Sequence, residues 1–369
     1  MDPYEQQRDG VVGCAKMAAG LSRRQRLGRL LDAMGIVTGV KHARRALGVP
    51  SFPVLTYHRI APSDAANPFD SQVIDATPQS FEEHVRMLTR DFTLVGTREV
   101  RAHFEGKRAL PSDAAMITFD DGYRSCRDVA LPILRRYGAH AVFFVATGHI
   151  ASRRLFWWDR TSYIVRRSTA AEIRLDYPER LTIARKPGDA ARVTSQLLRV
   201  VKDTYGLDVD RFLTELAQAA GVLWSHEVDA RLGDGLLLTW DDVRELRDAG
   251  MDIESHTRWH RVLDTLTPSD LQDELVGSRE DLEAQVGDPV RAIAYPVGVG
   301  GDHTVAAAVA RAGYAIGFSN ATGINDRRAA MAPLSVRRTA VDVPVSQAVL
   351  RAAMVVPNLT EVSPPRKAR

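Results

Sequence analysis

The stretch Met116-Ile117-Thr118-Phe119-Asp120-Asp121-Gly122 decides the fold of this 369-residue sequence. Its first four residues are typical of a buried strand, and two carboxylates and a glycine end that strand abruptly. Because strand side chains alternate between faces, the two aspartates can share one site only where the pleat breaks, and Gly122 permits such a break. Two close carboxylates also resist joint ionisation unless a cation offsets them. An ordinary Asp-Gly turn before a helix has the same composition, so this segment alone does not establish a metal site. Further candidate ligand residues must come from other parts of the sequence.

Short β-rich runs alternate with longer amphipathic stretches on both sides of this segment, from Phe52 onward. That alternation predicts parallel strands joined by helices. We expect seven strands, at residues 54–58, 116–119, 141–146, 252–255, 292–295, 315–319 and 336–341. We expect helices between them at residues 81–90, 98–105, 127–137, 240–249, 269–286 and 304–312. This α/β pattern favours a distorted (β/α) barrel with about seven parallel strands, in which functional residues lie at the C-terminal strand ends.

Residues 150–237 interrupt the rhythm, because they are longer than an ordinary crossover connection. They include the run Phe156-Trp157-Trp158-Asp159 and helical patterns at 192–202 and 210–220. We expect an inserted helical subdomain that helps to shape a substrate groove. The expected organisation is one domain over residues 51–350 with this insertion at about 150–237, preceded by a segment over 1–50 and followed by a tail over 351–369.

The composition is that of a globular protein, since 45% apolar residues suffice for a sizeable core. The two cysteines, Cys14 and Cys126, lie in unrelated contexts and predict neither a disulfide framework nor a thiolate metal cluster. No nucleic-acid-binding motif accompanies the small net charge of +3, so we expect no nucleic-acid partner.

The N-terminal segment is basic and amphipathic, with apolar residues near helical spacing at Leu27, Leu30, Leu31, Met34 and Val37. Such a segment either packs on the domain or lies on a membrane surface, so residues 21–45 are candidates for a peripheral membrane contact. The sequence shows no secretory signal pattern and no apolar run of membrane-spanning length. We therefore expect a cytoplasmic protein or one peripheral to the inner membrane face; the sequence does not predict the oligomeric state.

A second segment with candidate functional residues follows the expected strand at 252–255 and reads His256-Thr257-Arg258-Trp259-His260. Two histidines four residues apart would meet on one face of a helical turn and can bind one metal ion. Ser255 is placed to orient a histidine ring through a hydrogen bond. With Asp121 the pair makes a two-histidine, one-carboxylate set with open positions, as a hydrolytic metal site requires. The alternative is a chance pair of structural histidines.

A third segment, Ala294-Tyr295-Pro296-Val297-Gly298, again runs from a strand into a turn. A simple Pro-Gly turn explains this composition nearly as well. Its place at a strand end makes Tyr295 and Pro296 candidates for a substrate-binding or oxyanion role.

These three segments, in this order, resemble the polysaccharide deacetylase family, also called the NodB-homology domain or carbohydrate esterase family 4, over about residues 53–343. The resemblance implies a distorted (β/α) barrel with fewer than eight strands and a divalent metal, usually Zn²⁺, held by Asp121, His256 and His260. It further implies that Asp120 is the general base and that the backbone N–H of Tyr123 forms part of an oxyanion site.

The sequence departs from better-known family members at two positions. Those members carry an arginine just before the proline of the third segment, which orients the base, and a late Leu-x-His whose imidazole is the general acid. Here Tyr295 precedes Pro296, and Arg291 lies roughly 13 Å back along the strand. The late segment Leu334-Ser335-Val336-Arg337-Arg338 contains no histidine.

The strand Thr56-Tyr57-His58-Arg59 resembles the sub-group that begins with a Tyr-His-Arg strand. His58 is therefore a candidate to bind a ligand or donate a proton at the site, with a structural histidine at a strand end as the alternative. Arg338 is a candidate to hold Asp120 or a substrate group, with a surface charge as the alternative.

The resemblance implies a hydrolase that removes N-acetyl groups from an amino-sugar polysaccharide or oligosaccharide, so the expected partner is an acetylated amino-sugar glycan. Two alternatives stay open at this point. The same site could act on another amide or an O-acetyl ester, or the chain could bind glycans without turnover, because the usual late histidine is missing.

Overall fold

Eight parallel strands follow one another in the order β14-β12-β11-β10-β7-β6-β2-β15, forming a nearly closed barrel. The computed structural model describes residues 23–47, 51–62, 67–297, 303–326, 331–341 and 345–356. The strands are β2 (Val54–Tyr57), β6 (Ala114–Phe119), β7 (Val142–Val145), β10 (Asp252–Ser255), β11 (Ala292–Ala294), β12 (Ile316–Ser319), β14 (Val336–Arg337) and β15 (Thr339–Ala340). The distorted (β/α) barrel expected from the sequence is confirmed.

The barrel almost closes because its two outermost strands come from one short segment. The single strand predicted over 336–341 is wrong: β14 pairs with β12, β15 pairs with β2, and only Arg338 lies between them. The chain passes from one sheet edge to the other here, and one continuous ladder cannot serve both edges. The first strand is also shorter than predicted, since β2 ends at Tyr57 and His58 follows it.

Side-chain alternation divides the strand residues between two cores. In β6, Met116 faces inward and contributes to the barrel interior, whereas Ile117 and Phe119 face outward and pack against the surrounding helices. Phe144 of β7 and Phe318 of β12 meet in the interior with their ring centroids 5.2 Å apart. Both faces of these parallel strands are therefore buried, which explains why every residue of β6 is buried and all but Thr118 are apolar.

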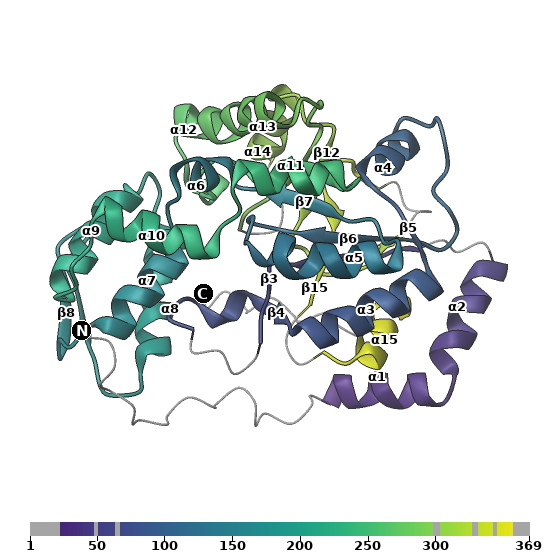
Figure 1. Ribbon diagram of the computed structural model, residues 1–369, viewed down its shortest axis with the longest axis horizontal. Coiled ribbons are helices and arrows are strands. Elements are labelled where there is room, and N and C mark those ends of the chain that lie inside the picture. The colour runs from purple at the N-terminus through teal and green to yellow at the C-terminus, as the bar shows by residue number, and fades with distance from the viewer. Residues whose placement is uncertain are drawn as a thin grey trace.

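Helices surround the strands on the outside (Figure 1). They are α3 (Pro78–Asp91), α4 (Thr97–Phe104), α5 (Leu131–Tyr137), α11 (Trp240–Asp248), α12 (Pro268–Gln272), α13 (Ser278–Val286) and α14 (His303–Arg311). Two predicted helices are interrupted by π-helical turns, at Cys126–Ala130 and Asp273–Gly277, so the continuous helices predicted over 127–137 and 269–286 are corrected. The short strand β5 (Thr93–Leu94) pairs with the start of β6.

The insertion forms its own layer beside the barrel, at the left of Figure 1. It contains α7 (Trp157–Arg167), an antiparallel hairpin of β8 (Glu172–Leu175) and β9 (Leu181–Ala184), α8 (Ala190–Asp203), α9 (Val209–Ala219) and α10 (His226–Leu236). α8 and α9 correspond to the two predicted helical patterns. α7, α10 and the hairpin were not predicted, and α7 is buried on nearly every side.

Two helices at the N-terminal end, α1 (Arg23–Ala33) and α2 (Ile36–Ala46), pack on α15 (Gln347–Val355) at the opposite side of the barrel (Figure 1). α15 crosses residue 350, where the sequence suggested that the tail begins. Within the described residues, no helix combines the length and apolar character needed to cross a membrane.

Candidate active site

The pleat of β6 breaks immediately after Phe119. The N–H of Asp120 still donates to the carbonyl of Tyr57 at 2.8 Å, but Asp121 and Gly122 have φ angles of 75° and 100°. Asp120 follows the inward alternation of β6, and the left-handed turn brings the Asp121 carboxylate toward the same side. A side chain at residue 122 could not replace glycine without strain, because its Cβ would lie 2.9 Å from Ile150 Cδ1.

Asp121, His256 and His260 lie together, all buried, with their potential ligand atoms within 4.8 Å of one another. Asp121 Oδ1 is 3.4 Å from Nε2 of His256 and 3.3 Å from Nε2 of His260. The prediction that the two histidines share a helical turn is wrong. They lie on an irregular loop in which Thr257 and His260 have positive φ. Ser255 accepts the N–H of Thr257 at 3.1 Å, so its hydroxyl fixes this loop rather than a histidine ring.

The hydrogen bonding of this group fits a bound cation. Both carboxylate oxygens of Asp121 and Nδ1 of His260 are buried without a hydrogen-bond partner. Nδ1 of His256 lies 2.9 Å from the carbonyl of Ala294, which orients Nε2 toward Asp121. Burial, and next the neighbouring His256, keep the pKa of His260 well below its ordinary value, so its ring stays neutral as a metal ligand must. Two imidazoles and one carboxylate are a ligand set suited to Zn²⁺.

Asp120 is held by Arg338, which lies 218 residues later in the sequence. Nη1 of Arg338 donates to Asp120 Oδ1 at 2.7 Å, and both side chains are almost completely buried. Burial alone raises the pKa of Asp120, but the charge of Arg338, then those of His256 and His58, and finally the Arg338 hydrogen bond outweigh it and leave the pKa below its ordinary value. Asp120 is therefore an ionised carboxylate.

Arg338 is itself fixed by residues at the end of β12. Nη2 donates to Asn320 Oδ1 at 2.7 Å, and Nε donates to the carbonyl of Ser319 at 3.3 Å. The side-chain amide of Asn320 donates in turn to the carbonyl of Pro296 at 2.8 Å. Sequence reasoning did not identify Asn320, although it lies two residues beyond the inward-facing Phe318 and so on the same side of β12.

His58 lies on the other side of Asp120. Its Nε2 is 4.0 Å from Asp120 Oδ2, and its Nδ1 is 3.0 Å from Asp75 Oδ2. Burial lowers the pKa of His58, but the charge and hydrogen bond of Asp75 outweigh this effect and raise the pKa to about 10. The imidazole is thus protonated at neutral pH. Asp75, which lies within β4 (Ile74–Ala76), was not identified from the sequence.

Tyr123 points its side chain into the insertion. Its hydroxyl donates to Asp159 Oδ2 at 2.7 Å and accepts the indole N–H of Trp158 at 2.8 Å. Its backbone forms a bridge with Leu237 whose two hydrogen bonds use the flanking residues and not the Tyr123 N–H. The backbone N–H of Tyr123, which the family resemblance assigns to an oxyanion site, therefore takes no part in the hydrogen bonds of this bridge.

Tyr295 and Pro296 have different surroundings from Tyr123. The Tyr295 hydroxyl donates to the carbonyl of Leu334 at 2.8 Å, and its ring is buried in the core, so the side chain braces the barrel and is not available to a substrate. Pro296 follows directly, and its carbonyl accepts from Asn320. Any contact of this segment with a substrate would have to come from the turn.

The insertion contributes an aromatic wall to the group around Asp121. The rings of Trp158 and His260 meet edge to face with centroids 4.5 Å apart, and the indole N–H of Trp157 donates to the His260 carbonyl at 3.1 Å. The ring of Phe156 stacks on Trp158 at 4.4 Å. The aromatic run noted in the sequence thus reaches the site, through contacts with a histidine that only the fold brings near.

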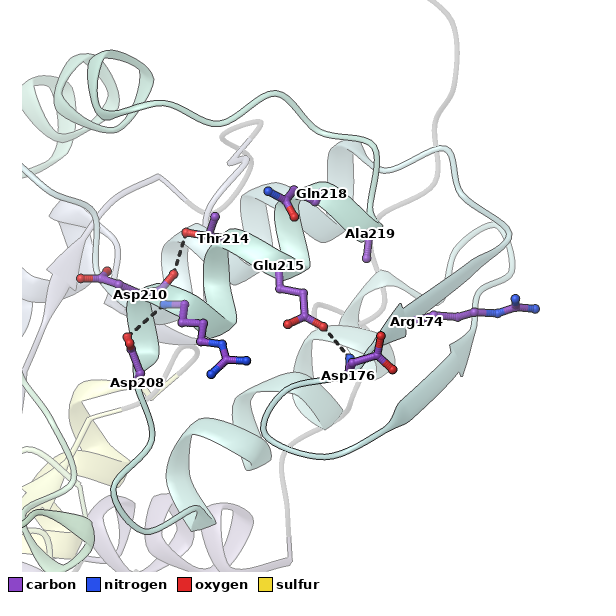
Figure 2. A pocket seen from close by; sticks show the side chains of 9 residues that line it. Arg174, Asp176, Asp208, Asp210, Thr214, Glu215, Gln218 and Ala219 are labelled. Carbon is purple, nitrogen blue, oxygen red and sulfur yellow. Dashed lines mark hydrogen bonds between the residues drawn. The ribbon is translucent and has the colours of Figure 1, made fainter.

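A surface depression of about 790 Å³ lies on the insertion (Figure 2), and none of the residues described above lines it. Its polar groups already serve local structure: Asp208 accepts the N–H of Arg211 at 3.0 Å, and the Thr214 hydroxyl donates to the carbonyl of Asp210 at 2.7 Å. Glu215 likewise accepts the N–H of Asp176. This depression therefore lacks the uncompensated polar groups that mark the Asp121 site.

Comparisons with known proteins give one consistent result. The profile of the polysaccharide deacetylase family matches residues 107–317. A poly-beta-1,6-N-acetyl-D-glucosamine N-deacetylase of Staphylococcus epidermidis is 28% identical over 106 residues, which are 27% of this chain and 37% of the relative. The chain spans about a third of the length of the curated relatives it matches.

Two solved structures share the fold. The Streptococcus pyogenes deacetylase PplD, in complex with acetate, superimposes with a TM-score of 0.54 at 20% identity, covering 83% of this chain and 99% of that one. IcaB from Ammonifex degensii superimposes with a TM-score of 0.52 at 18% identity, covering 82% of this chain and 97% of that one.

Proposed function

Because the chain belongs to the polysaccharide deacetylase family, we propose that it hydrolyses N-acetyl groups of an amino-sugar polysaccharide or oligosaccharide. The observation that supports this most is the different environment of two adjacent carboxylates. Asp121 faces two histidines with its oxygens unpartnered, whereas Asp120 is held ionised by Arg338. One carboxylate is thus suited to a cation and the other to a proton.

Asp121, His256 and His260 would hold the divalent ion, which we propose to be Zn²⁺. When bound, such an ion polarises the amide carbonyl and acidifies the attacking water. Asp120 accepts the proton of that water, because its low pKa keeps it ionised and Arg338 fixes one of its oxygens. The N–H of Tyr123 donates to the carbonyl oxygen as negative charge develops there.

The leaving amine needs a proton, and His58 is the candidate donor. It carries a proton at neutral pH, rests on Asp75, and lies 4.0 Å from Asp120 on the side away from Arg338. The C–N bond then breaks, the amine takes the proton from Nε2, and acetate leaves with the oxygen of the water. This assignment gives the sequence a substitute for the missing late histidine.

The test is acetate release from acetylated β-1,6- and β-1,4-linked glucosamine oligomers, with and without added Zn²⁺. We expect release only with metal, and the Asp120→Asn variant should be slower by about 10² to 10⁴-fold, the usual contribution of a general base. The β-1,6 series comes first because the Staphylococcus epidermidis relative bears that polymer in its name. Unimpaired release by Asp120→Asn would refute the mechanism, and release only from O-acetyl esters would refute the substrate class.

A further inference from the structure

The exposed large apolar side chains of the described residues gather on one short segment. Five of the seven lie on α1, α2 and the residues beside them, at Leu27, Leu30, Met34, Ile36 and Leu47, with exposed fractions of 42% to 71%. Leu27 and Leu30 of α1 and Met34, just past its end, follow the spacing i, i+3, i+7 and form one stripe. The other two, Tyr205 and Leu223, lie apart on the insertion.

The opposite face of the same helices is already used in the fold. Val37 is buried with Ala352 and Val355 of α15. Arg351 donates from Nη1 to Asp32 at 2.8 Å and from Nη2 to Thr38 at 3.0 Å. The two helices are therefore docked on α15, and their exposed stripe is a second apolar face that the core does not explain.

Charge indicates what covers this stripe. Residues 23–47 contain seven lysines and arginines and one carboxylate, Asp32, which Arg351 already engages. Arg29 and Arg45 are exposed on the same two helices as the apolar residues. Two copies of this face would bring like charges together, whereas an anionic lipid surface offers both an apolar layer and neutralising phosphates.

We propose that α1 and α2 attach the chain to the surface of a membrane that contains anionic phospholipids. Each helix has 11 residues, so it is too short to span a bilayer and would lie in the plane of the interface. The apolar stripe enters the boundary between headgroups and acyl chains, and the flanking cations meet the phosphates. This inference is independent of the proposed catalytic activity and concerns where that activity is held.

The test is flotation of the full chain with vesicles of phosphatidylcholine containing about one-third phosphatidylglycerol, compared with pure phosphatidylcholine vesicles. We expect the chain to float with the anionic vesicles at low salt and to be released as ionic strength rises. The partition coefficient of the Leu30→Ser/Met34→Ser variant onto the anionic vesicles should be lower by at least about tenfold. Leu223→Ser is the matched control, because its side chain is 93% exposed on the insertion, and it should bind like the parent chain.

Three outcomes would overturn the proposal: no flotation of the parent chain, equal binding to both vesicle types, or unchanged binding of the Leu30/Met34 variant. A parent dimer that this variant converts to monomer, without vesicle binding, would instead assign the face to a second copy. Arg29→Glu/Arg45→Glu should remove the preference for anionic vesicles. Thermal unfolding of each variant shows that the fold is intact, and acetate release from soluble oligomers scores the proposed activity separately.

Discussion

Two buried carboxylates, Glu254 and Asp121, lie near opposite ends of the barrel in opposite states. Glu254 of β10 is buried and, beside the start of β11, accepts from the Thr97 hydroxyl at 2.9 Å and from the N–H groups of Arg291 and Ala292 at 2.9 and 2.7 Å. Beyond the C-terminal end of β10, His256 faces Asp121, whose two buried oxygens have no hydrogen-bond partner. A satisfied buried carboxylate stabilises the fold, whereas one without a hydrogen-bond partner is suited to binding a cation. The difference separates the structural end of the barrel from its chemical end.

Asp121→Asn should have the largest effect and break the comparison at the chemical end. We expect Zn²⁺ to bind more than about 100-fold more weakly, because a charged ligand is replaced by a neutral amide, and acetate release should fall to background. The metal-free variant should be no less stable than the metal-free parent, since no hydrogen bond is lost. Zinc titration and urea unfolding measure the two quantities; a clear loss of metal-free stability would contradict the distinction.

Arg338→Lys and Asn320→Ala examine how Asp120 is held. A lysine keeps the charge but loses the planar fork that reaches Asp120 and Asn320 together, so we expect kcat to fall about 10- to 100-fold. Asn320→Ala should lower kcat about tenfold with KM unchanged, because it acts through Arg338. Arg337→Met is the control, since that side chain is exposed on the opposite side of the strand. Equal effects of all three variants would indicate a general structural defect.

Glu254→Gln should break the comparison at the structural end. An amide cannot accept from every donor around residue 254, and we expect the free energy of unfolding to fall by about 1–3 kcal/mol. Zinc stoichiometry should remain that of the parent chain. Urea unfolding and metal analysis of one preparation measure the two quantities. A loss of zinc without a loss of stability would contradict the structural role assigned to Glu254.

His58→Gln should have the smallest effect on stability and sharpen the comparison through pH. Asp75 raises the folded-state pKa of His58 to about 10, above the unfolded value near 6.5, so the pair stabilises the fold in full below about pH 6.5. That stability is lost as pH rises through about 10. The parent should therefore exceed the variant by about 1 kcal/mol in unfolding free energy near pH 6, and the two should converge near pH 10. A difference independent of pH would contradict this role for the ion pair.

The ends of β6, β10 and β11 were predictable because local pattern fixes them. β10 has its predicted bounds, and β6 and β11 differ from their predicted bounds by one or two residues, since apolar runs and the residues that stop them are neighbours in sequence. Alternation then continues past those ends: Met116 faces inward and Asp120 follows on that side, as Asn320 follows Phe318. Asn320 could have been found by this count. The helical turn expected for His256 and His260 could not be corrected in this way, because positive φ angles at Thr257 and His260 leave no clear local signature.

By itself, the sequence determined the strand–helix alternation, the family resemblance and the three segments that contain Asp121, His256 and His260. Only the tertiary structure decided what surrounds them. Arg338 reaches Asp120 because the last strand run splits across the barrel seam, and Asp75 reaches His58 through a separate small sheet. The Arg338 contact depends on closure of the whole barrel and the Asp75 contact on pairing within that small sheet, so spacing along the chain carries no record of either. The same closure leaves the Asp121 oxygens buried without a partner, and this feature is the physical reason to expect a metal there.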